Sequence, residues 1–384
     1  MTQSAKGEAK KFSIAVIPGD GIGPEVIGET KKIVEAAARK DGASFEWADY
    51  PFGAAHYLKT GEILPDWALS VLGEHDAMLL GAIGDPKVKP GILERGILLT
   101  LRFFFDQYVN LRPARSLPNV PTPVPLDGTM DSVVVRENTE DLYMGLGGVT
   151  LTGRLLTSLD LDRGGYSLRG SLTLSSTPEM PFAAQVAMNT RFGVTRITKY
   201  ACETAKKRGE NRVTIVTKSN AAPFLYGFFE EIAKETIESE YPGMTCDAVN
   251  VDALCYHLVR SPGAYGVLLC PNLFGDIVSD LQAGLAGGLG TAAGGNIGQG
   301  LSMFEPVHGS APDIAGTGKA NPIAAILSGA LMLRHLDMSE AAASVESAVS
   351  QYLERTPGRN LPIEFGGDAT CTAAGDAILD ILTA

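Results

Sequence analysis

The sequence predicts an α/β protein of about two domains that carries a β-hairpin arm. The chain has 384 residues, of which 45% are hydrophobic, and a single core rarely grows beyond roughly 250–300 residues. Across residues 12–85, strand patterns alternate with helix patterns, which favours a parallel sheet covered by helices. Residues 151–173 alternate Leu with Ser, Thr and Arg around a glycine pair, a pattern typical of a hairpin.

The composition is that of an ordinary globular protein. The formal net charge of -12 argues against non-specific binding to nucleic acid or to anionic membranes. Five cysteines without any C-x-x-C spacing suit a reducing compartment, and we interpret them as mostly buried packing residues. Residues 1–11 are polar, and no window reaches the length of a membrane span. We therefore expect a cytoplasmic protein with no membrane or nucleic-acid partner.

A glycine-rich loop joins the first strand to the first helix. Residues 12–17 form an apolar run, and a helical pattern follows Pro24, which suits a first helical turn, and stops before Gly42. The loop does not meet the G-x-G-x-x-G spacing, because Gly23 falls one place early and Pro24 takes the last position. The sequence therefore predicts a tight turn near a nucleotide and not a Rossmann phosphate loop.

Three arginines, Arg102, Arg112 and Arg136, are each embedded in apolar sequence. A buried guanidinium without an anionic partner is costly, and each guanidinium can bind a carboxylate in two places. Together the three suit a small polycarboxylate ligand. Internal salt bridges with Asp or Glu are the alternative for each of them.

Prolines crowd the stretch from Pro113 to Pro125, which predicts an extended passage that we interpret as a crossing between domains. The arm beyond it has apolar side chains on one side and needs a surface to pack against. A second copy of the chain is the simplest partner, so we expect a homodimer.

Charges and glycines follow the predicted strands of the second half. Lys218 ends a strand that begins at residue 212, and Asp252 ends a strand at residues 249–252; both are site candidates, with ordinary strand capping as the alternative. The runs 287–290 and 294–296 are predicted loops whose glycines let a ligand approach the backbone. From residue 324 to residue 384 the pattern predicts amphipathic helices.

Asp276 and Asp280 form an acidic pair four residues apart. Ile277, Leu281 and Leu285 recur at helical spacing, so both carboxylates should project from one side of one turn. Asp276 is predicted to cap this helix, which places the pair at a loop-to-helix junction. Oxygen ligands of this kind suit a hard divalent cation such as Mg2+, completed by substrate and water. A solvated helix face is the alternative.

Two longer motifs contain these residues. They read Asn-Leu-Phe-Gly-Asp-Ile-Val-Ser-Asp-Leu at residues 272–281 and Phe-Glu-Pro-Val-His-Gly-Ser-Ala-Pro-Asp-Ile-Ala-Gly at residues 304–316. With them the chain resembles the β-decarboxylating dehydrogenases, the family of isopropylmalate, isocitrate, homoisocitrate and tartrate dehydrogenases, from about residue 12 to at least residue 335.

The resemblance implies a two-domain α/β fold of the isopropylmalate dehydrogenase type, with a mixed sheet, flanking helices and a β-arm for dimerisation. It implies a discontinuous cofactor-binding domain of residues 1–107 and 287–384. The substrate, metal and dimerisation domain would span residues 108–286, with the arm at about residues 151–174.

The resemblance also implies an activity, the oxidation of a 2-hydroxy acid with NAD or NADP followed by loss of the carboxylate β to the new ketone. Asp276 and Asp280, with Asp252 of a second copy, would hold Mg2+ or Mn2+, which stabilises the enolate by Lewis-acid catalysis. The residues that would contact the substrate are Leu98, Leu99, Arg102, Arg112, Arg136 and Asp252.

Two further residues are implied to move protons. Lys218 of the second copy would help to remove the hydroxyl proton, and Tyr143 would protonate the enolate. A lysine acts as a base near pH 7 only where burial and a nearby cation lower its affinity for protons. Because Lys218 and Asp252 would serve the neighbour's site, the resemblance implies a homodimer with shared active sites and an inactive monomer.

The cofactor-binding positions implied by the resemblance are His308, Gly309, Ser310, Ala311, Asp313, Ile314 and Asn321. A carboxylate at Asp313 can accept hydrogen bonds from the ribose 2'-hydroxyl but repels a 2'-phosphate, so we expect NAD as the cofactor.

The substrate's variable group is expected to be apolar. Leu98 and Leu99 favour isopropyl, since each buried methylene contributes about 0.8 kcal/mol. This points to 3-isopropylmalate, its product 4-methyl-2-oxopentanoate and leucine biosynthesis. The sequence of residues 136–143 is more similar to that of isocitrate and homoisocitrate enzymes, and the arm is longer than in isopropylmalate enzymes. Homoisocitrate, isocitrate, tartrate and other 3-substituted malates therefore stay alternative substrates. A non-catalytic regulatory subunit is the alternative of another class.

Overall fold

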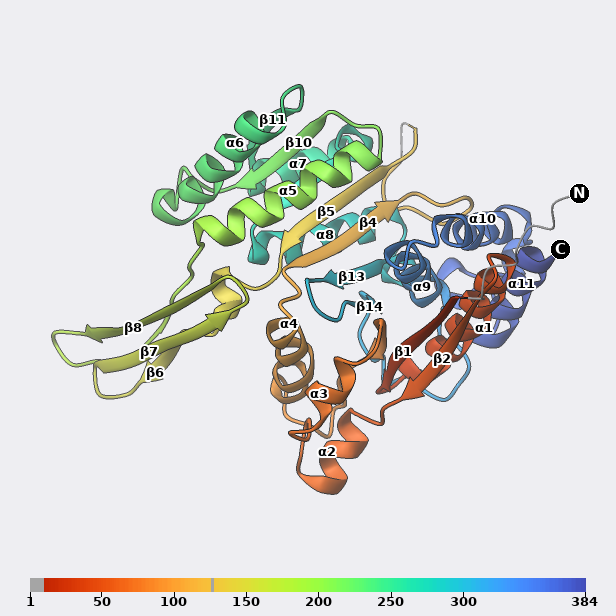
Figure 1. The fold of residues 1–384 in the computed structure, drawn as a ribbon, viewed down its shortest axis with the longest axis horizontal. Helices are drawn as coiled ribbons and strands as arrows, with labels where there is room; N and C mark the ends of the chain where they lie inside the picture. The colour runs from red at the N-terminus through yellow and green to blue at the C-terminus, as the bar shows by residue number, and fades with distance from the viewer. Residues whose placement is uncertain (1–9, 126–127) are drawn as a thin grey trace, which may run out of the picture. The chain divides into compact units, whose positions relative to one another are not determined.

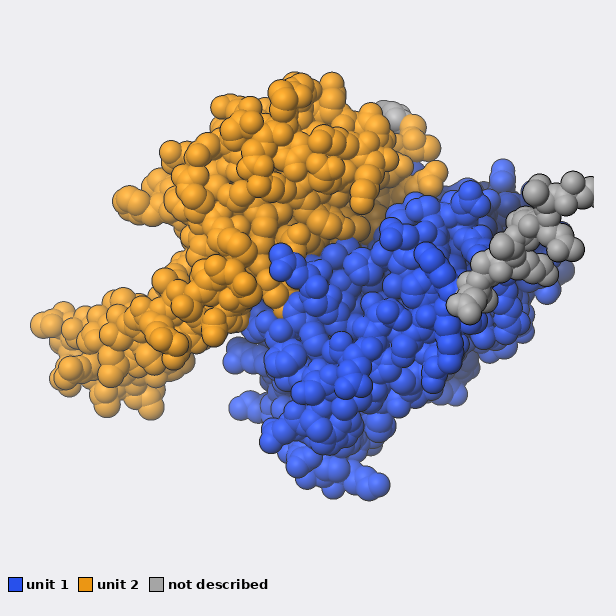
Figure 2. All heavy atoms as spheres, viewed as in Figure 1, with its two compact units in different colours: residues 1–105, 116–123, 283–384 blue, residues 106–115, 124–282 orange. Residues whose placement is uncertain are grey.

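The chain forms two compact units in the computed structural model, which describes residues 10–125 and 128–384. One unit comprises residues 1–105, 116–123 and 283–384, and the other comprises residues 106–115 and 124–282 (Figure 2). The proline-rich stretch 113–125 contains two of the points at which the chain passes from one unit to the other. Most of the polar lead-in, residues 1–9, lies outside the described residues.

The first unit is built on strands in the order β13-β14-β3-β1-β2, of which all but β3 are labelled in Figure 1. Strand β1 pairs in parallel with β2 and β3, β3 pairs in parallel with β14, and β14 pairs antiparallel with β13. The bounds are β1 (Lys10–Gly19), β2 (Ala43–Asp49), β3 (Ala77–Ala82), β13 (Ala293–Ile297) and β14 (Met303–Pro306).

Helices and short helical turns complete this unit. They are α1 (Gly23–Lys40), α2 (Ala54–Thr60), α3 (Ala68–Leu72), the π-helical turn η1 (Glu94–Leu99), α4 (Thr100–Phe104), η5 (Leu289–Thr291), α9 (Ile323–His335), α10 (Ser339–Arg355), η6 (Gly358–Asn360), η7 (Ile363–Phe365) and α11 (Cys371–Thr383). The first turn of α1 contains Pro24, which suits that position. Glu25 in the same turn, with Arg39 and Lys40 in the last turn, complements the helix dipole at both ends.

Helix α9 departs from the predicted amphipathic pattern. It is buried at most of its positions, because it packs against β13 and β14 and also against α1 and α10. A helix enclosed in this way is apolar all round. The prediction is confirmed for α10 and α11, which each keep one buried face and one exposed face.

The predicted ligand loop at residues 294–296 is wrong, because these residues form strand β13. Packing explains the glycines there. A Cβ on Gly295 would lie 3.1 Å from the Phe304 ring, and one on Gly294 would lie 3.1 Å from the Glu305 carbonyl oxygen. Residues 287–290 do form a turn, in which Gly287 has a φ of +124°.

The glycine loop between β1 and α1 is the tight turn that the sequence predicts. Gly21 has a φ of +58°, and a Cβ on it would lie 1.8 Å from the carbonyl oxygen of Ser310. The same carbonyl accepts a hydrogen bond from the Ile22 amide at 2.9 Å. The loop therefore needs glycine in order to lie against the segment that contains Ser310.

The second unit has strands in the order β11-β10-β12-β5-β4. Neighbouring strands are parallel except for β4 and β5. The bounds are β4 (Val109–Arg115), β5 (Asp131–Glu137), β10 (Arg212–Thr217), β11 (Thr245–Asn250) and β12 (Val267–Cys270). Both units thus combine a mixed sheet with flanking helices, and the predicted fold class is confirmed.

The helices and helical turns that complete the second unit are η2 (Asp141–Met144), α5 (Arg191–Lys207), the π-helical turn η3 (Pro223–Gly227), α6 (Phe228–Glu240), α7 (Val251–Arg260), η4 (Pro262–Ala264) and α8 (Asn272–Ala286). The last turn of α8 is counted with the first unit.

The predicted hairpin arm is confirmed. Strands β7 (Arg154–Arg163) and β8 (Tyr166–Ser175) pair antiparallel around Gly164 and Gly165. At the base of the arm, the short strands β6 (Gly147–Thr150) and β9 (Phe182–Gln185) form a separate antiparallel pair. Leucines lie opposite one another along the hairpin, as in the pair Leu155 and Leu174, so one face of the arm is apolar.

The root of the arm is anchored by a buried carboxylate, Glu140. It accepts hydrogen bonds from the Tyr166 hydroxyl at 2.6 Å and from the Thr190 amide and hydroxyl at 2.7 and 2.6 Å. Its neighbour Glu137 is fully buried and accepts from the Thr139 amide at 3.0 Å and the Thr139 hydroxyl at 2.7 Å. Burial, with the charge of Glu140 added, raises the pKa of Glu137 to about 7.

The cysteines behave as packing residues. All five are free, and Cys202, Cys270 and Cys371 are buried. Burial raises the pKa of each of these three thiols. Within the described residues, the chain forms no helix both long and apolar enough to cross a bilayer.

Replacement of Gly21 tests the tight turn. We expect Gly21→Ala to lower the free energy of unfolding by about 1–3 kcal/mol, because alanine is strained at positive φ and its methyl group would clash with the Ser310 carbonyl oxygen. The matched control is Gly28→Ala, since Gly28 lies in α1 and a methyl group added there would have nothing within 4 Å. It should stabilise the protein by roughly 1 kcal/mol through helix propensity. Urea unfolding of both variants measures the difference, and equal effects would contradict the assignment.

Glu137 should make stability depend on pH. Its folded-state pKa is raised, so its stabilising contribution is present below about pH 4.5 and is lost as the pH rises to about 7. Glu137→Gln removes this titration, and its stability relative to the unmodified protein should therefore rise between pH 5 and pH 8. Urea unfolding at several pH values measures the difference, with the exposed Glu238→Gln as control. A difference that does not change with pH would refute the assignment.

Candidate active site

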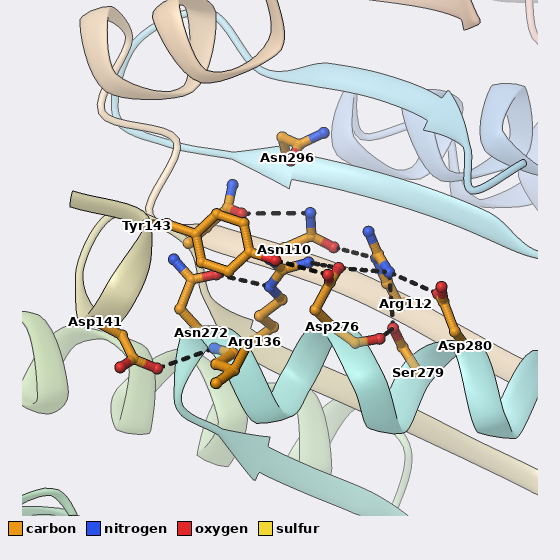
Figure 3. A network of polar contacts seen from close by, with 12 residues as sticks. Asn110, Arg112, Arg136, Asp141, Tyr143, Asn272, Asp276, Ser279, Asp280 and Asn296 are labelled. Atoms are coloured by element: carbon orange, nitrogen blue, oxygen red, sulfur yellow. Dashed lines mark hydrogen bonds and ion pairs between the residues drawn. The ribbon is translucent and has the colours of Figure 1, made fainter. Parts of the chain in front are cut away.

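Helix α8 carries both members of the acidic pair on one face (Figure 3). The helix begins at Asn272, so Asp276 lies beyond its first turn, and the prediction that Asp276 caps the helix is wrong. The amide of Leu273, at the true start, donates instead to the carboxylate of Asp141 at 2.9 Å. The helix can start earlier because a distant segment supplies the acceptor that its first amides need.

Arg112 and Arg136 converge on the acidic pair (Figure 3). Arg112 Nη1 lies 3.1 Å from Asp280 Oδ1 and 3.5 Å from Asp276 Oδ1. Arg136 is 1% exposed, and its Nη1 forms an ion pair with Asp276 Oδ1. The structure thus brings four predicted site residues together in one network within the second unit.

Tyr143 completes this network. Its hydroxyl donates to Asp276 Oδ2 at 2.7 Å, and the Arg136 guanidinium lies 4.9 Å from the centre of its ring. Burial raises the pKa of Tyr143, and the hydrogen bond to Asp276 raises it further against the opposing charge of Arg136. The phenol therefore keeps its proton at neutral pH and can act as a proton donor.

The acidic pair is suited to a cation. Burial raises the pKa of Asp280, and the negative charge of Asp276 adds to this rise while Arg112 opposes it. The charge of Asp276 therefore disfavours the charged form of Asp280, and a nearby positive charge favours it. Arg112 Nη1 lies within 3.5 Å of an oxygen of each, so it marks the position at which both carboxylates can contact one cation.

Lys218 and Asp252 form a separate pair. Lys218 Nζ lies 2.6 Å from Asp252 Oδ1, and this contact lowers the pKa of Asp252. Strand β11 ends at Asn250, so Asp252 lies in the first turn of α7, and its predicted place at the end of a strand is wrong. Among the described residues no three Asp, Glu, His or Cys side chains gather closely enough to hold a metal. Asp252 of one chain is therefore not beside the acidic pair of the same chain.

The remaining predicted substrate residues belong to the first unit. Arg102 is buried and pairs with Glu305 at 3.1 Å. Leu98 and Leu99 lie at the end of the π-helical turn η1, where Leu98 packs partly buried against a core that contains Ile97 and Leu101. Arg102, Arg112 and Arg136 thus each form an ion pair with a carboxylate, which is the internal salt bridge that the sequence offers as the alternative to ligand binding.

The predicted cofactor segment lies in the first unit. The Ile22 amide donates a hydrogen bond to the Ser310 carbonyl oxygen of this segment. His308 Nδ1 lies 3.0 Å from the Gly309 carbonyl oxygen, and burial lowers the pKa of His308. The ring is therefore neutral at pH 7, and its buried Nε2 has no hydrogen-bond partner among the described residues. A ring that donates through Nδ1 presents Nε2 as an acceptor.

Asn321 is held by a residue that the sequence analysis missed. Its Nδ2 donates to Glu364 at 2.9 Å, and the Gly290 amide donates to the same carboxylate at 3.1 Å. A Cβ on Gly290 would lie 1.7 Å from Glu364 Oε2, so this glycine admits the carboxylate. By contrast, Asp313 is exposed and has no ion pair within the part of the chain that the structure describes.

Three polar residues that support the arginines were also missed as site residues. Asn110 and Ser279 accept from Arg112 at 2.8 Å each, and Asn272 accepts from Arg136 at 2.9 Å. Asn272 and Ser279 stand within the motif at residues 272–281, which is the signal that could have found them. Asn110 belongs to neither of the two motifs, and only its position two residues before Arg112 could have identified it from the sequence.

Comparisons with known proteins identify the family of this chain. The model of the family described as isocitrate/isopropylmalate dehydrogenase matches residues 13–378. Among curated proteins, a 3-isopropylmalate dehydrogenase of Clavibacter sepedonicus is 44% identical over 97% of this chain and 99% of its own length. One from Streptomyces coelicolor is 45% identical over 96% of this chain and 100% of its own length.

A solved structure of isocitrate dehydrogenase from Methylococcus capsulatus is 35% identical, with a TM-score of 0.81, and the match covers 97% of this chain and 100% of that one. The family resemblance that the motifs indicate is confirmed. Because the family model spans nearly the whole chain and the relatives are similar over their full length, this protein belongs to the isocitrate/isopropylmalate dehydrogenase family.

Proposed function

We propose that the protein is an NAD-dependent dehydrogenase that oxidises and decarboxylates a 3-substituted malate. The substrate we propose is 3-isopropylmalate and the product 4-methyl-2-oxopentanoate, which places the enzyme in leucine biosynthesis. The relatives named 3-isopropylmalate dehydrogenase, at 44–45% identity, support this choice. The observation that carries the chemistry is the convergence of Arg112, Arg136 and Tyr143 on Asp276 and Asp280.

Asp276 and Asp280 would hold a divalent cation, Mg2+ or Mn2+. Carboxylate oxygens are the ligands these ions prefer, and the two side chains already share one positive partner in Arg112. A bound cation supplies Lewis-acid chemistry, which polarises the new ketone and favours loss of carbon dioxide. The third protein ligand in this proposal is Asp252 of a second copy.

Arg112 and Arg136 would bind the malate carboxylates. Arg136 is buried, and its Nη2 has no hydrogen-bond partner within the described residues, so a carboxylate ligand would supply an acceptor that the guanidinium lacks. When a cation takes up the charge of the aspartates, the arginines become available to an anionic substrate. Arg102 of the first unit is proposed to bind a further carboxylate.

Two residues would move protons. Tyr143, whose phenol stays protonated at neutral pH because its pKa is raised, would deliver a proton to the enolate carbon. Lys218 of the second copy would take part in removal of the hydroxyl proton, with Asp252 beside it at 2.6 Å. Both roles are general acid–base catalysis by positioned side chains.

A homodimer with shared sites is part of this proposal. Exposed apolar side chains lie on or near the elements that carry the proposed groups. Tyr256 is 63% exposed on α7, which carries Asp252, and Ile277 is 53% exposed on α8, which carries the acidic pair. Phe224 is 96% exposed on η3, the helical turn that follows Lys218. Burial of these side chains against a partner would remove apolar surface from water. A second copy packed there would cover these side chains and could lend Lys218 and Asp252.

The first unit would bind NAD through His308, Gly309, Ser310, Ala311, Asp313, Ile314 and Asn321. The exposed carboxylate of Asp313 suits a ribose 2'-hydroxyl and repels a 2'-phosphate. Leu98 and Leu99 favour an isopropyl substituent on the substrate. We place the enzyme in the cytoplasm, where its five free thiols stay reduced.

A panel of 3-substituted malates tests the substrate and cofactor. With Mg2+ and NAD, purified protein should reduce NAD fastest with 3-isopropylmalate, because apolar residues discriminate against a carboxylate-bearing substituent. Absorbance of NADH measures the rate, and omission of the metal is the control. Turnover only with isocitrate or homoisocitrate would contradict the roles of Leu98 and Leu99, and a higher kcat/KM with NADP would contradict that of Asp313. No turnover with any substrate would favour the regulatory alternative.

Mixed dimers test the shared site. Lys218→Ala and Tyr143→Phe should each lower the rate by about two to four orders of magnitude. When the two inactive variants are unfolded together and refolded, half of the dimers are mixed, and each mixed dimer has one intact site. Activity should then return to about a quarter of that of the unmodified protein.

The matched control is a mixture of Tyr143→Phe with Asp280→Asn. Both residues belong to the same chain's contribution, so every site in a mixed dimer stays defective and activity should not return. Recovery in this control, or none in the first mixture, would show that the site is not shared as proposed.

A further inference from the structure

Asp141 combines burial, an unusual backbone conformation and contact with α8, the helix that carries the acidic pair. It is 0% exposed, and its φ is +64°. Positive φ costs energy for any residue with a Cβ, although Asp and Asn tolerate it better than most. A glycine would relieve this strain, so the side chain must supply something that a glycine would not.

The carboxylate of Asp141 holds the start of α8. Its Oδ2 accepts from the Leu273 amide at 2.9 Å, and its Oδ1 lies 3.5 Å from the Tyr226 hydroxyl. Leu273 is the second residue of α8, where amides have no acceptor within the helix. A negative charge at this end also interacts favourably with the helix dipole.

A second link joins the same segment to α8. Asn272 Nδ2 donates to the Glu140 carbonyl oxygen at 3.0 Å, while its Oδ1 accepts from Arg136 Nε at 2.9 Å. The backbone on the other side is held as well, since the Asp141 amide donates to the Met188 carbonyl oxygen at 2.8 Å. Residues 140–141 are therefore fixed to the helix at two adjacent points.

Tyr143 lies two residues beyond Asp141 in the same 3-10 turn, η2. Its hydroxyl contacts Asp276, which lies three residues after Leu273 on α8. Turn η2 therefore contacts α8 twice (Figure 3). Asp141, the first residue of η2, contacts Leu273, and Tyr143 contacts Asp276, which lies one helical turn after Leu273 on α8. The first contact sets the direction from which the phenol approaches Asp276.

We propose that Asp141 is a positioning residue for proton transfer by Tyr143: by capping α8 from outside the helix, it fixes turn η2 so that the phenol is held against Asp276. This inference rests on the proposed function of Tyr143. Loss of the carboxylate frees the turn while leaving the arginines that bind substrate in place. The rate of the proton transfer should therefore fall more than substrate binding.

Steady-state kinetics of Asp141→Gly and Asp141→Asn test this role. Glycine accepts the backbone conformation without supplying the carboxylate, so Asp141→Gly should fold. Its kcat should fall about ten- to a hundredfold and its KM should change by less than about threefold, because a misplaced catalytic group lowers the rate more than it weakens substrate binding. Asparagine tolerates positive φ and keeps an acceptor for the Leu273 amide, so it should restore most of kcat. A loss in KM alone, or equal losses in both variants, would overturn the proposal.

The matched control is Asp337→Gly. Asp337 also has a positive φ, +62°, but it is exposed in the first unit after α9. Glycine there should relieve strain and leave kcat unchanged. Hydrogen exchange gives a readout without metal, substrate or cofactor: the Leu273 amide should exchange faster in Asp141→Gly and return towards the original rate in Asp141→Asn. Unchanged exchange in Asp141→Gly would contradict the capping contact.

A double-mutant cycle separates this inference from the proposed function. If Asp141 acts through Tyr143, Tyr143→Phe should cost much less in the Asp141→Gly background than in the unmodified protein. Full additivity, with a large effect of Tyr143→Phe alone, would overturn the role of Asp141 and leave that of Tyr143 intact. No effect of Tyr143→Phe in either background would overturn both.

Discussion

The repulsion between Asp276 and Asp280, and its relief by two arginines, is the interaction on which the candidate site depends. Helix geometry places the two carboxylates on one face of α8, and partial burial raises the pKa of Asp280. Arg112 and Arg136 supply positive charge that opposes this rise. In the proposed function a bound divalent cation would take over the arginines' electrostatic role and leave the arginines for an anionic ligand.

The arginines of this arrangement illustrate the two interpretations that the sequence offers for each of them. An arginine embedded in apolar sequence can bind a ligand or belong to an internal salt bridge, and each of the three has a carboxylate partner in the structure. For Arg112 and Arg136 the two interpretations are compatible, because their partners are the acidic pair itself. Arg102 differs, since its partner Glu305 lies outside that pair.

The distribution of the other charged groups explains why the proposed chemistry requires two copies. Lys218 and Asp252 pair with each other at 2.6 Å, and within the described residues they do not gather with the acidic pair into a metal site. In the proposed dimer, assembly becomes a condition of catalysis and not only of stability. The exposed Phe224, Tyr256 and Ile277 lie on the elements that such an assembly would bring together.

Short-range pattern determined much of this protein from the sequence alone: the α/β class, the hairpin arm, the tight turn at Gly21 and the placement of two carboxylates on one helical face. These features depend on periodicity and turn chemistry over a few neighbouring residues. Tertiary structure alone decided where α8 starts, because the acceptor for Leu273 is 132 positions away at Asp141. It also decided that Asp252 lies in the first turn of a helix and that Gly294 and Gly295 form a strand against β14, which contains Phe304. Contacts between distant segments set these outcomes, and no local pattern records which distant side chain will supply a missing partner.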